Sequence, residues 1–363
     1  MGFLEKLSKS KELNNIMNPI HDQKPPEFIS SGNYALNGIV SGNVHNCIDT
    51  DSIVALVGPS NSGKSLFLAH FVKGAQELGH EIVIFDSERA VKKGYYEKIG
   101  CDVSKIYRIP VGSIIEFRNK AFDIIEKYYK ESDGKGKLFV GLDSLGNLAS
   151  DKELKDTEAD KDNSDQGTNA KFQNSAFRVL SSLACKYNFP CVFTNHVYAN
   201  PADMFGQRDK IAGGGKAIYN SNTIIYFERM VNKEEVEDEM GKKSKQHVGI
   251  KIKATTVKNR VYPEEKTVTM SLRFDSGVNP YSGLLPLALQ AGVLENKPRG
   301  FLVTETGSTV YEKNLYTKDV FTEGALEKIN LFLNQNGYSK LKDVFAPDVA
   351  IALGDSEDNA EEN

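Results

Sequence analysis

The chain has 363 residues, and at roughly 150 residues per domain this length predicts about two domains. Hydrophobic residues make up 40% of the chain and charged residues 26%, with 30 Gly and 12 Pro, which excludes collagen-like, mucin-like and wholly disordered proteins. The longest nearly apolar stretch, residues 284–294, is shorter than the roughly 20 residues that cross a bilayer, and the first residues lack a secretory pattern. We therefore expect no membrane segment and a cytoplasmic location.

The first 28 residues predict an N-terminal arm. Apolar residues recur at helical spacing through residues 1–17, and Pro19, Pro25 and Pro26 then interrupt the pattern. This predicts a helix on a tether, which either packs on its own domain or docks on a neighbouring subunit.

From residue 53 onward, short β-branched runs alternate with longer amphipathic stretches, the pattern of a parallel α/β sheet. Strands are expected at residues 53–57, 82–85, 138–142, 191–195 and 223–227, with helices at residues 64–78, 114–129 and 169–187. Two further strands, residues 247–257 and 267–274, are expected to extend the sheet. The predicted core is assigned to residues 29–282, between the arm and the C-terminal residues.

Three segments predict irregular structure because they are long, polar or rich in glycine: residues 151–166, 199–216 and 232–245. After the core, residues 283–294 and 323–336 predict a small helical unit, assigned to a C-terminal domain of residues 283–354. Residues 355–363 hold five acids, and without them the formal charge changes from −4 to +1. We expect these residues to form a solvated acidic tail, so the net charge does not exclude a nucleic-acid partner.

A phosphate-binding loop follows the first core strand. Its residues fit the pattern G-x-x-x-x-G-K-[ST] between a strand and a helix, and they are Gly58, Pro59, Ser60, Asn61, Ser62, Gly63, Lys64 and Ser65. Such a loop presents backbone N–H groups to phosphate oxygens, Lys64 reaches the β- and γ-phosphates, and the Ser65 hydroxyl can ligate Mg²⁺. The loop therefore predicts an ATP site.

Carboxylates follow two neighbouring core strands. Asp143 ends an apolar strand, where it can hold magnesium through the water shell of the ion. Asp86 and Glu88 follow another strand, at the edge where open α/β sheets bind ligands. One of these two can polarise a water for attack on the γ-phosphate, while either can merely cap the following turn.

These residues resemble the RecA-family recombinases, most closely the phage UvsX branch, from about residue 29 to residue 283. The similarity includes residues 29–36 before the phosphate-binding loop and residues 142–148 around Asp143. By this resemblance, Glu88 activates the attacking water and Tyr95 stacks on adenine, although helix packing alone explains an aromatic residue there. His196 matches the strand end that senses the γ-phosphate, where bacterial RecA carries Gln.

The resemblance also implies a DNA-binding loop and an in-trans contact. The loop after His196 looks like the second DNA-binding loop, with glycines that allow close approach, apolar side chains that wedge between bases and cations for phosphates. Its candidate residues are Met204, Phe205, Arg208, Lys210, Gly213, Gly214, Gly215 and Lys216. Lys258 and Arg260 resemble the cations that reach the nucleotide of the adjacent protomer. Residues 151–171 correspond to the first DNA-binding loop but hold more acids than lysines.

The resemblance thus implies a RecA-like P-loop core that uses ATP and Mg²⁺, forms homo-oligomeric helical filaments on single-stranded DNA, and exchanges strands with homologous duplex DNA. A single-strand-binding protein and a loader protein are expected partners, and the location becomes the host cytoplasm if a phage encodes the chain. Two alternatives stay open: a hexameric helicase of the same fold, and a non-catalytic, nucleotide-regulated DNA-binding protein. The expected arm, and the absence of a large N-terminal domain in the sequence, favour the recombinase over the helicase.

Overall fold

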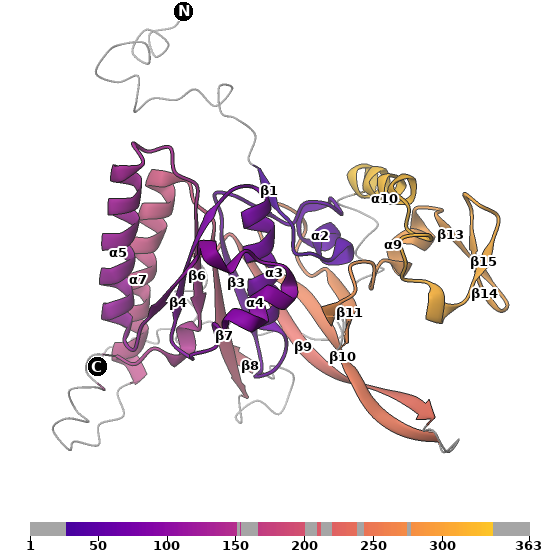
Figure 1. The fold of residues 1–363 in the computed structure, drawn as a ribbon, viewed down its shortest axis with the longest axis horizontal. Coiled ribbons are helices and arrows are strands. Elements are labelled where there is room, and N and C mark those ends of the chain that lie inside the picture. Colours follow the sequence, from indigo (N-terminus) through magenta and orange to yellow (C-terminus); the bar gives the residue numbers. More distant parts are fainter. Residues whose placement is uncertain are drawn as a thin grey trace, which may run out of the picture.

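The computed structural model describes residues 27–150, 153, 166–199, 209–211, 220–237, 243–273 and 277–336 (Figure 1). The predicted N-terminal arm up to residue 26 and the acidic tail therefore lie outside the described residues, as do nearly all of residues 151–165. Within the described part of the chain, no helix has both the length and the apolar character needed to cross a membrane.

A large, mostly parallel sheet forms the centre of the molecule, as the sequence predicts (Figure 1). Its parallel strands run in the order β9, β3, β7, β6, β4, β5. Their bounds are β3 (Ile53–Gly58), β4 (Glu81–Asp86), β5 (Ile106–Pro110), β6 (Leu138–Asp143), β7 (Cys191–Ala199) and β9 (Thr223–Glu237). Antiparallel strands continue the sheet beyond β9: β10 (Lys243–Asn259), β11 (Thr267–Arg273) and β12 (Gly277–Val278). The short strand β8 (Asp209–Ile211) pairs with β7.

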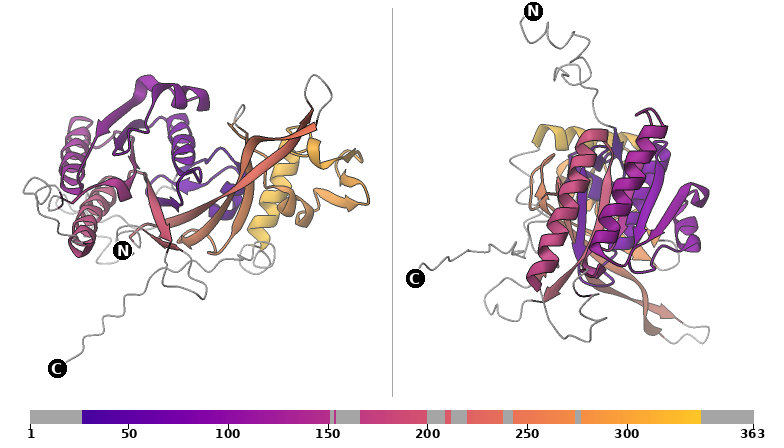
Figure 2. Two further views of the ribbon diagram at one scale, coloured as in Figure 1. Left: turned by 90° about the horizontal axis from the view of Figure 1, so that it is seen from below. Right: turned by 90° about the vertical axis from the view of Figure 1, so that its left-hand side faces the viewer.

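Helices cover both faces of this sheet, and the alternation of strand side chains divides the core accordingly. In β3, Val54 and Leu56 belong to one hydrophobic cluster, whereas Ala55 and Val57 belong to the other. The first cluster packs under α3 (Lys64–Glu77), with α2 (Tyr34–Ser41) and α4 (Lys93–Ile99) beside it. The second packs under α5 (Ile114–Glu131) and α7 (Gln166–Tyr187), which lie side by side in Figure 2. Because both faces of β3 are buried, its sequence is continuously apolar.

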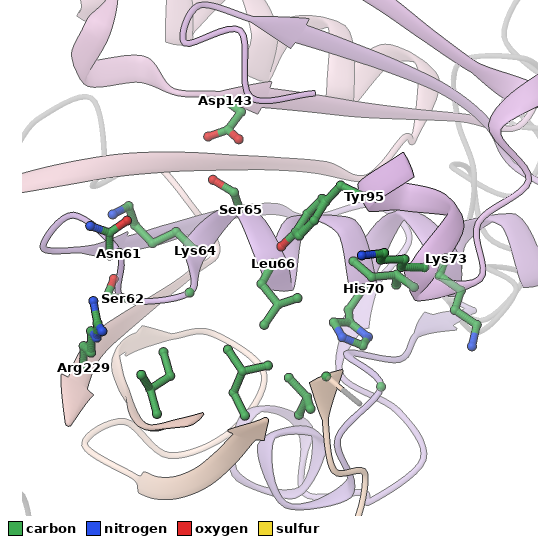
Figure 3. A pocket seen from close by; sticks show the side chains of 18 of the residues that line it. Asn61, Ser62, Lys64, Ser65, Leu66, His70, Lys73, Tyr95, Asp143 and Arg229 are labelled. Carbon is green, nitrogen blue, oxygen red and sulfur yellow. The ribbon is translucent and has the colours of Figure 1, made fainter. Parts of the chain in front are cut away.

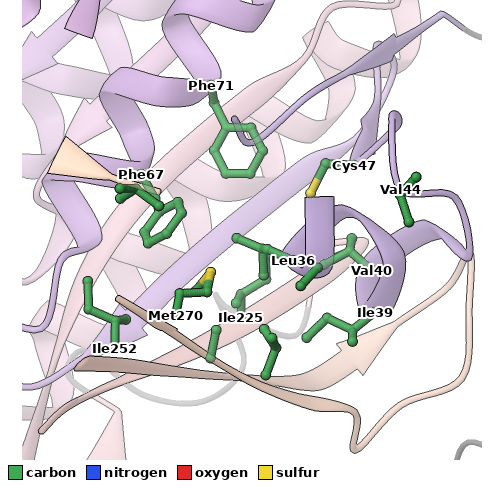
Figure 4. Packing of buried hydrophobic residues seen from close by; sticks show 14 of the residues in the cluster. Leu36, Ile39, Val40, Val44, Cys47, Phe67, Phe71, Ile225, Ile252 and Met270 are labelled. Atoms are coloured by element: carbon green, nitrogen blue, oxygen red, sulfur yellow. The ribbon is translucent and has the colours of Figure 1, made fainter. Parts of the chain in front are cut away.

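The C-terminal part differs from the helical unit that the sequence predicts. Between α9 (Leu285–Gln290) and α10 (Glu323–Asn336) lies a three-stranded antiparallel sheet of β13 (Leu294–Lys297), β14 (Gly300–Val303) and β15 (Thr309–Val310). The expectation of helices alone was wrong because these strands are short and largely exposed, which leaves little periodic pattern. Leu287 and Leu333 from this part belong to the same hydrophobic cluster as Leu36 and Ile39 of α2. Figure 4 shows Leu36 and Ile39 in this cluster.

The expectation of irregular structure at residues 232–245 was wrong for residues 232–237 and 243–245, since β9 extends to Glu237 and β10 begins at Lys243. Residues 238–242 lie outside the described residues. The two strands form a long antiparallel ribbon in which Lys243 pairs with Glu237 and Lys245 with Glu235. The sequence of this segment is highly charged and lacks the apolar alternation that predicts a strand, so the ribbon could not be recognised from it. The described residues also form two short strands, β1 (Phe28–Ile29) and β2 (Ile48–Asp49). They form three short 3-10 helices as well: η2 (Val103–Lys105), η3 (Leu145–Asn147) and η4 (Glu312–Asn314).

Candidate functional site

The predicted phosphate-binding loop connects β3 to α3 at the carboxyl edge of the sheet. Gly58 has φ of 153°, and a Cβ there would lie 2.2 Å from the carbonyl oxygen of Phe227. Gly63 has φ of 98° at the start of α3, where a Cβ would lie 2.7 Å from Ile252 Cδ1. Gly58 is therefore required because a side chain there would push the loop away from the backbone of β9, and Gly63 is required because its φ lies in the region that side chains rarely adopt.

Lys64 folds back over this loop. Its Nζ donates hydrogen bonds to the carbonyl oxygens of Gly58 at 2.9 Å and Pro59 at 2.7 Å. Burial lowers the pKa of Lys64, while the negative charges of Glu88 and Asp143 oppose that shift. An anion in the loop would stabilise the ammonium group further, so the arrangement suits a phosphate.

Asp143 and Ser65 point toward one another across the site (Figure 3). The Asp143 carboxylate accepts a hydrogen bond from Thr194 Oγ1 at 2.6 Å and another from Ser65. Burial is the main cause that raises the pKa of Asp143, and these two hydrogen bonds oppose it. A hydroxyl beside a buried carboxylate is an oxygen donor set that suits Mg²⁺, whose charge would offset the cost of that burial.

A buried polar atom without a partner among the described residues also indicates that the loop binds an anion. The Ser62 hydroxyl is buried and has no hydrogen-bond partner among the described residues. A buried hydroxyl without a partner carries a free-energy cost that a bound anion or its water shell can relieve. The residues present thus fit a nucleotide polyphosphate together with a magnesium ion.

Glu88 lies at the other wall of the site, held by two side chains. Its Oε1 atom lies 2.7 Å from His196 Nε2 and accepts a hydrogen bond from the Ser144 hydroxyl. The His196 hydrogen bond is the largest of the causes that lower the pKa of Glu88, and Ser144 and Lys64 add to it. Glu88 is therefore an ionised carboxylate that faces the loop lysine across the cavity.

Asp86, the alternative that the sequence leaves open, occupies a different environment. Its side chain is fully buried, and its Oδ2 accepts a hydrogen bond from Arg108 Nε at 2.6 Å. It also accepts hydrogen bonds from the backbone N–H groups of Glu88, Ala90 and Val91. The Asp86 carboxylate thus fixes the turn that carries Glu88, whereas the Glu88 carboxylate opens into the cavity.

A single cavity of about 1160 Å³ joins these groups (Figure 3). Lys64, Ser65, Glu88, Asp143 and His196 all line it, as does Tyr95 of α4. The Tyr95 side chain is 37% exposed and projects into the cavity, so a flat ring can stack on it. Burial is the main cause that raises the pKa of Tyr95, which keeps its hydroxyl protonated at neutral pH.

The cavity is also lined by charged residues that the sequence does not single out: Lys73, Lys98, Arg229 and Arg273. With Lys64 they make five Lys and Arg side chains against the three carboxylates Glu77, Glu88 and Asp143. The excess of positive charge favours an anionic ligand. No local motif marks these cations, because α3, α4, β9 and β11 each contribute one of them.

Lys258 and Arg260 do not join this cavity. Lys258 pairs with Ile224, which pairs with Ala55 of β3, so the two cations lie toward the amino end of β3. At about 3.3 Å per residue, Lys258 lies roughly 10 Å before Gly58 along the strands, and Arg260 lies farther. Burial lowers the pKa of Lys258, and the charge of Arg260 adds to that shift.

The candidate DNA-binding residues fall almost entirely outside the described residues. These are Met204, Phe205, Arg208, Gly213, Gly214, Gly215 and Lys216. Lys210 lies in β8, where its backbone pairs with Tyr198 of β7. Because β7 also carries His196, the segment begins on the strand that contacts Glu88.

The similarity of this chain to known proteins extends over all the residues of the site. A family model described as the RecA N-terminal domain matches residues 3–279. The "Recombination and repair protein" of Enterobacteria phage T4 is 31% identical over 288 residues, which are 77% of this chain and 68% of that protein. Protein RecA of Acholeplasma laidlawii is 24% identical over 253 residues, or 70% of this chain and 71% of that protein. Protein RecA of Chloroherpeton thalassium is 26% identical over 243 residues, or 67% and 63%.

Proposed function

Because this chain belongs to the RecA family, we propose that it is a recombinase that acts in homologous recombination and DNA repair. In this proposal it is a DNA-dependent ATPase that forms helical filaments on single-stranded DNA and exchanges strands with a homologous duplex. The observation that carries the ATPase assignment is the convergence of Lys64, Asp143 and Glu88 on one cavity. A binding-only relative would not need a carboxylate such as Glu88 poised beside the phosphate-binding loop.

The proposed chemistry is phosphoryl transfer from ATP to water. Magnesium, when bound, neutralises charge on the phosphates, and Ser65 and Asp143 are the residues that would hold it. The backbone N–H groups of the loop and the Lys64 ammonium group stabilise the negative charge that develops on the transferred phosphoryl group. Glu88 orients the attacking water, and His196 holds the Glu88 carboxylate in position.

We propose that Lys258 and Arg260 act on the nucleotide of a neighbouring protomer. Lys258 lies level with Ala55 of β3, Arg260 lies farther from the loop of its own chain, and neither lines its cavity. A filament in which each nucleotide lies between two subunits would bring these cations to the next chain's phosphates. Such an arrangement makes hydrolysis depend on assembly.

The same proposal predicts the partners of the protein and its location in the cell. DNA and further copies of the chain are the principal partners, and a single-strand-binding protein and a loader protein are proposed as accessory ones. The site of action is the cytoplasm, which is the host cytoplasm if a phage encodes the chain. Residues 1–28 would join protomers, residues 29–282 would form the ATPase and DNA-binding core, and residues 283–354 would form the small C-terminal domain.

Electron microscopy with single-stranded DNA and a non-hydrolysable ATP analogue tests this function. We expect helical filaments that require both the DNA and the nucleotide. Closed rings of six subunits would instead support the helicase alternative. DNA binding without any nucleotide turnover would support the non-catalytic alternative.

Glu88→Gln is expected to bind ATP and DNA yet hydrolyse ATP at least about a hundredfold more slowly, because an amide cannot act as a base toward water. Filaments formed with ATP should then persist. Phosphate release and filament lifetime on single-stranded DNA measure the two effects. Asp86→Asn is the comparison: slow turnover with normal ATP binding in that variant, alongside an active Glu88→Gln, would show that the wrong carboxylate was chosen.

His196→Leu is expected to move the acid limb of the ATPase pH profile to higher pH. The His196 hydrogen bond lowers the pKa of Glu88, so Glu88 stays ionised as the pH falls. Without that hydrogen bond the pKa of Glu88 rises toward its ordinary value, and activity is lost at a higher pH. His196→Gln keeps a donor and should shift the limb less. An unchanged acid limb in His196→Leu would contradict this role.

A further inference from the structure

One face of the β9–β10 ribbon packs toward the phosphate-binding loop, and next to the loop it carries the apolar residues Phe227, Ile250 and Ile252. On this face, Phe227 stacks on Phe67 of α3 with ring centroids 5.0 Å apart. Ile252 of β10 lies against Gly63, and Ile250 lines the cavity. Arg229 pairs directly with Ile252 and follows Phe227 by two residues, so it lies on this same face.

Arg229 brings a guanidinium group to the mouth of the loop. It lines the cavity with Asn61 and Ser62, and Figure 3 shows its side chain directed at Ser62. On the opposite face of the ribbon, the neighbouring Glu228 pairs with Lys253 at 3.5 Å, so that carboxylate is engaged elsewhere. Arg229 is exposed to solvent, so its guanidinium group is accessible to an anion bound at the loop.

The carboxylates of the cavity contact other side chains than Arg229. Glu88 contacts His196, Asp143 contacts Thr194, and Glu77 lies 4.0 Å from Lys73. Within the described ranges, Arg229 makes no ion pair with any carboxylate. The cavity therefore holds a planar, five-donor cation beside the loop, a group well matched to phosphate oxygens.

We propose that Arg229 binds the terminal phosphate of the nucleotide held by its own chain. The proposal rests on the proposed function, in which Tyr95 stacks on the base. Figure 3 shows Tyr95 and Arg229 on opposite sides of Lys64 and Ser65, so a nucleotide that begins at Tyr95 points its last phosphate toward Arg229. Arg229 then contacts a triphosphate but not a diphosphate, and it acts in cis, unlike Lys258 and Arg260.

Nucleotide affinity without DNA tests this assignment on the full-length protein. Arg229→Gln is expected to weaken binding of a non-hydrolysable ATP analogue about tenfold or more, the loss of one charge-assisted contact. ADP affinity should change less than about twofold, which also shows that the variant is folded. Arg229→Lys should recover part of the loss. Lys251→Gln removes a cation from the other face of the same ribbon and should change neither affinity.

Mixing variants tests the cis assignment. Arg229→Gln mixed with Lys64→Ala should regain no hydrolysis, because each chain lacks a group that its own site needs. Regained hydrolysis would overturn the cis assignment, and an equal loss of ATP and ADP affinity in Arg229→Gln would overturn the contact with the terminal phosphate. Unchanged affinities for both nucleotides in Arg229→Gln would overturn that contact as well. A wild-type protein that binds neither nucleotide would instead refute the proposed function.

Discussion

Lys64→Ala is expected to lower ATP turnover by at least a hundredfold while the protein stays folded. The Lys64 ammonium group is buried at the loop and donates hydrogen bonds to the carbonyl oxygens of Gly58 and Pro59. In the proposed mechanism it exchanges these bonds for phosphate oxygens. Two charge-assisted contacts at about 1.5–3 kcal/mol each correspond to roughly a hundredfold or more in rate.

The fold should survive because the stability of this region comes from apolar packing under α3, chiefly Phe67, Phe71 and Val72. Steady-state phosphate release measures the turnover, and thermal unfolding monitored by circular dichroism measures the fold. Lys130→Ala, on the exposed face of α5, is the matched control and should keep full turnover. Near-normal hydrolysis by folded Lys64→Ala would refute the assignment of the phosphate-binding loop.

The parts of the site that follow from local sequence could be predicted, since each depends on a short contiguous pattern. The loop from Gly58 to Ser65 depends on two glycines, a lysine and a hydroxyl at fixed spacing between an apolar strand and a helix. The strand ending in Asp143 is continuously apolar because both of its faces are buried. The residue types and their order are therefore enough to predict the loop and the position of Asp143 at the end of its strand.

The choice between Asp86 and Glu88 could not be made from residue types, because it depends on a neighbouring strand. Arg108 of β5 reaches Asp86 and leaves Glu88 to face the cavity. β5 was not predicted, since it is a half-exposed edge strand of five residues without a clean alternation. The resemblance to a known family selected Glu88 where the local pattern did not.

Some missed elements did carry signals. The helix α2 begins after Asn33, whose side chain accepts a hydrogen bond from the N–H of Leu36, and ends at Gly42 in the left-handed region. An Asn cap and a terminal Gly are recognised helix boundaries. Arg229 carried no such signal, because its position follows from the register between β9 and β10 and from the close approach of β9 to Gly58.

The proposed sharing of the nucleotide site between protomers predicts a second large effect. A chain carrying Lys258→Ala and Arg260→Ala should hydrolyse ATP at least about a hundredfold more slowly when DNA is present, because two charge-assisted contacts to a neighbour's nucleotide are lost. Its own loop, Glu88 and Asp143 stay intact, so nucleotide binding by the isolated chain should change little. A filter-binding assay with labelled ATP analogue and a DNA-stimulated ATPase assay separate the two quantities.

Mixing this double variant with Lys64→Ala should restore part of the DNA-dependent hydrolysis. Each variant is nearly inactive alone, but a junction can pair the intact loop of the double variant with the intact cations of Lys64→Ala. The cations lie toward the amino end of β3, away from the loop of their own chain, so the restored activity must come from such junctions. If both chains enter the same DNA complexes and no hydrolysis returns, Lys258 and Arg260 act within their own chain or elsewhere, and the in-trans mechanism is wrong.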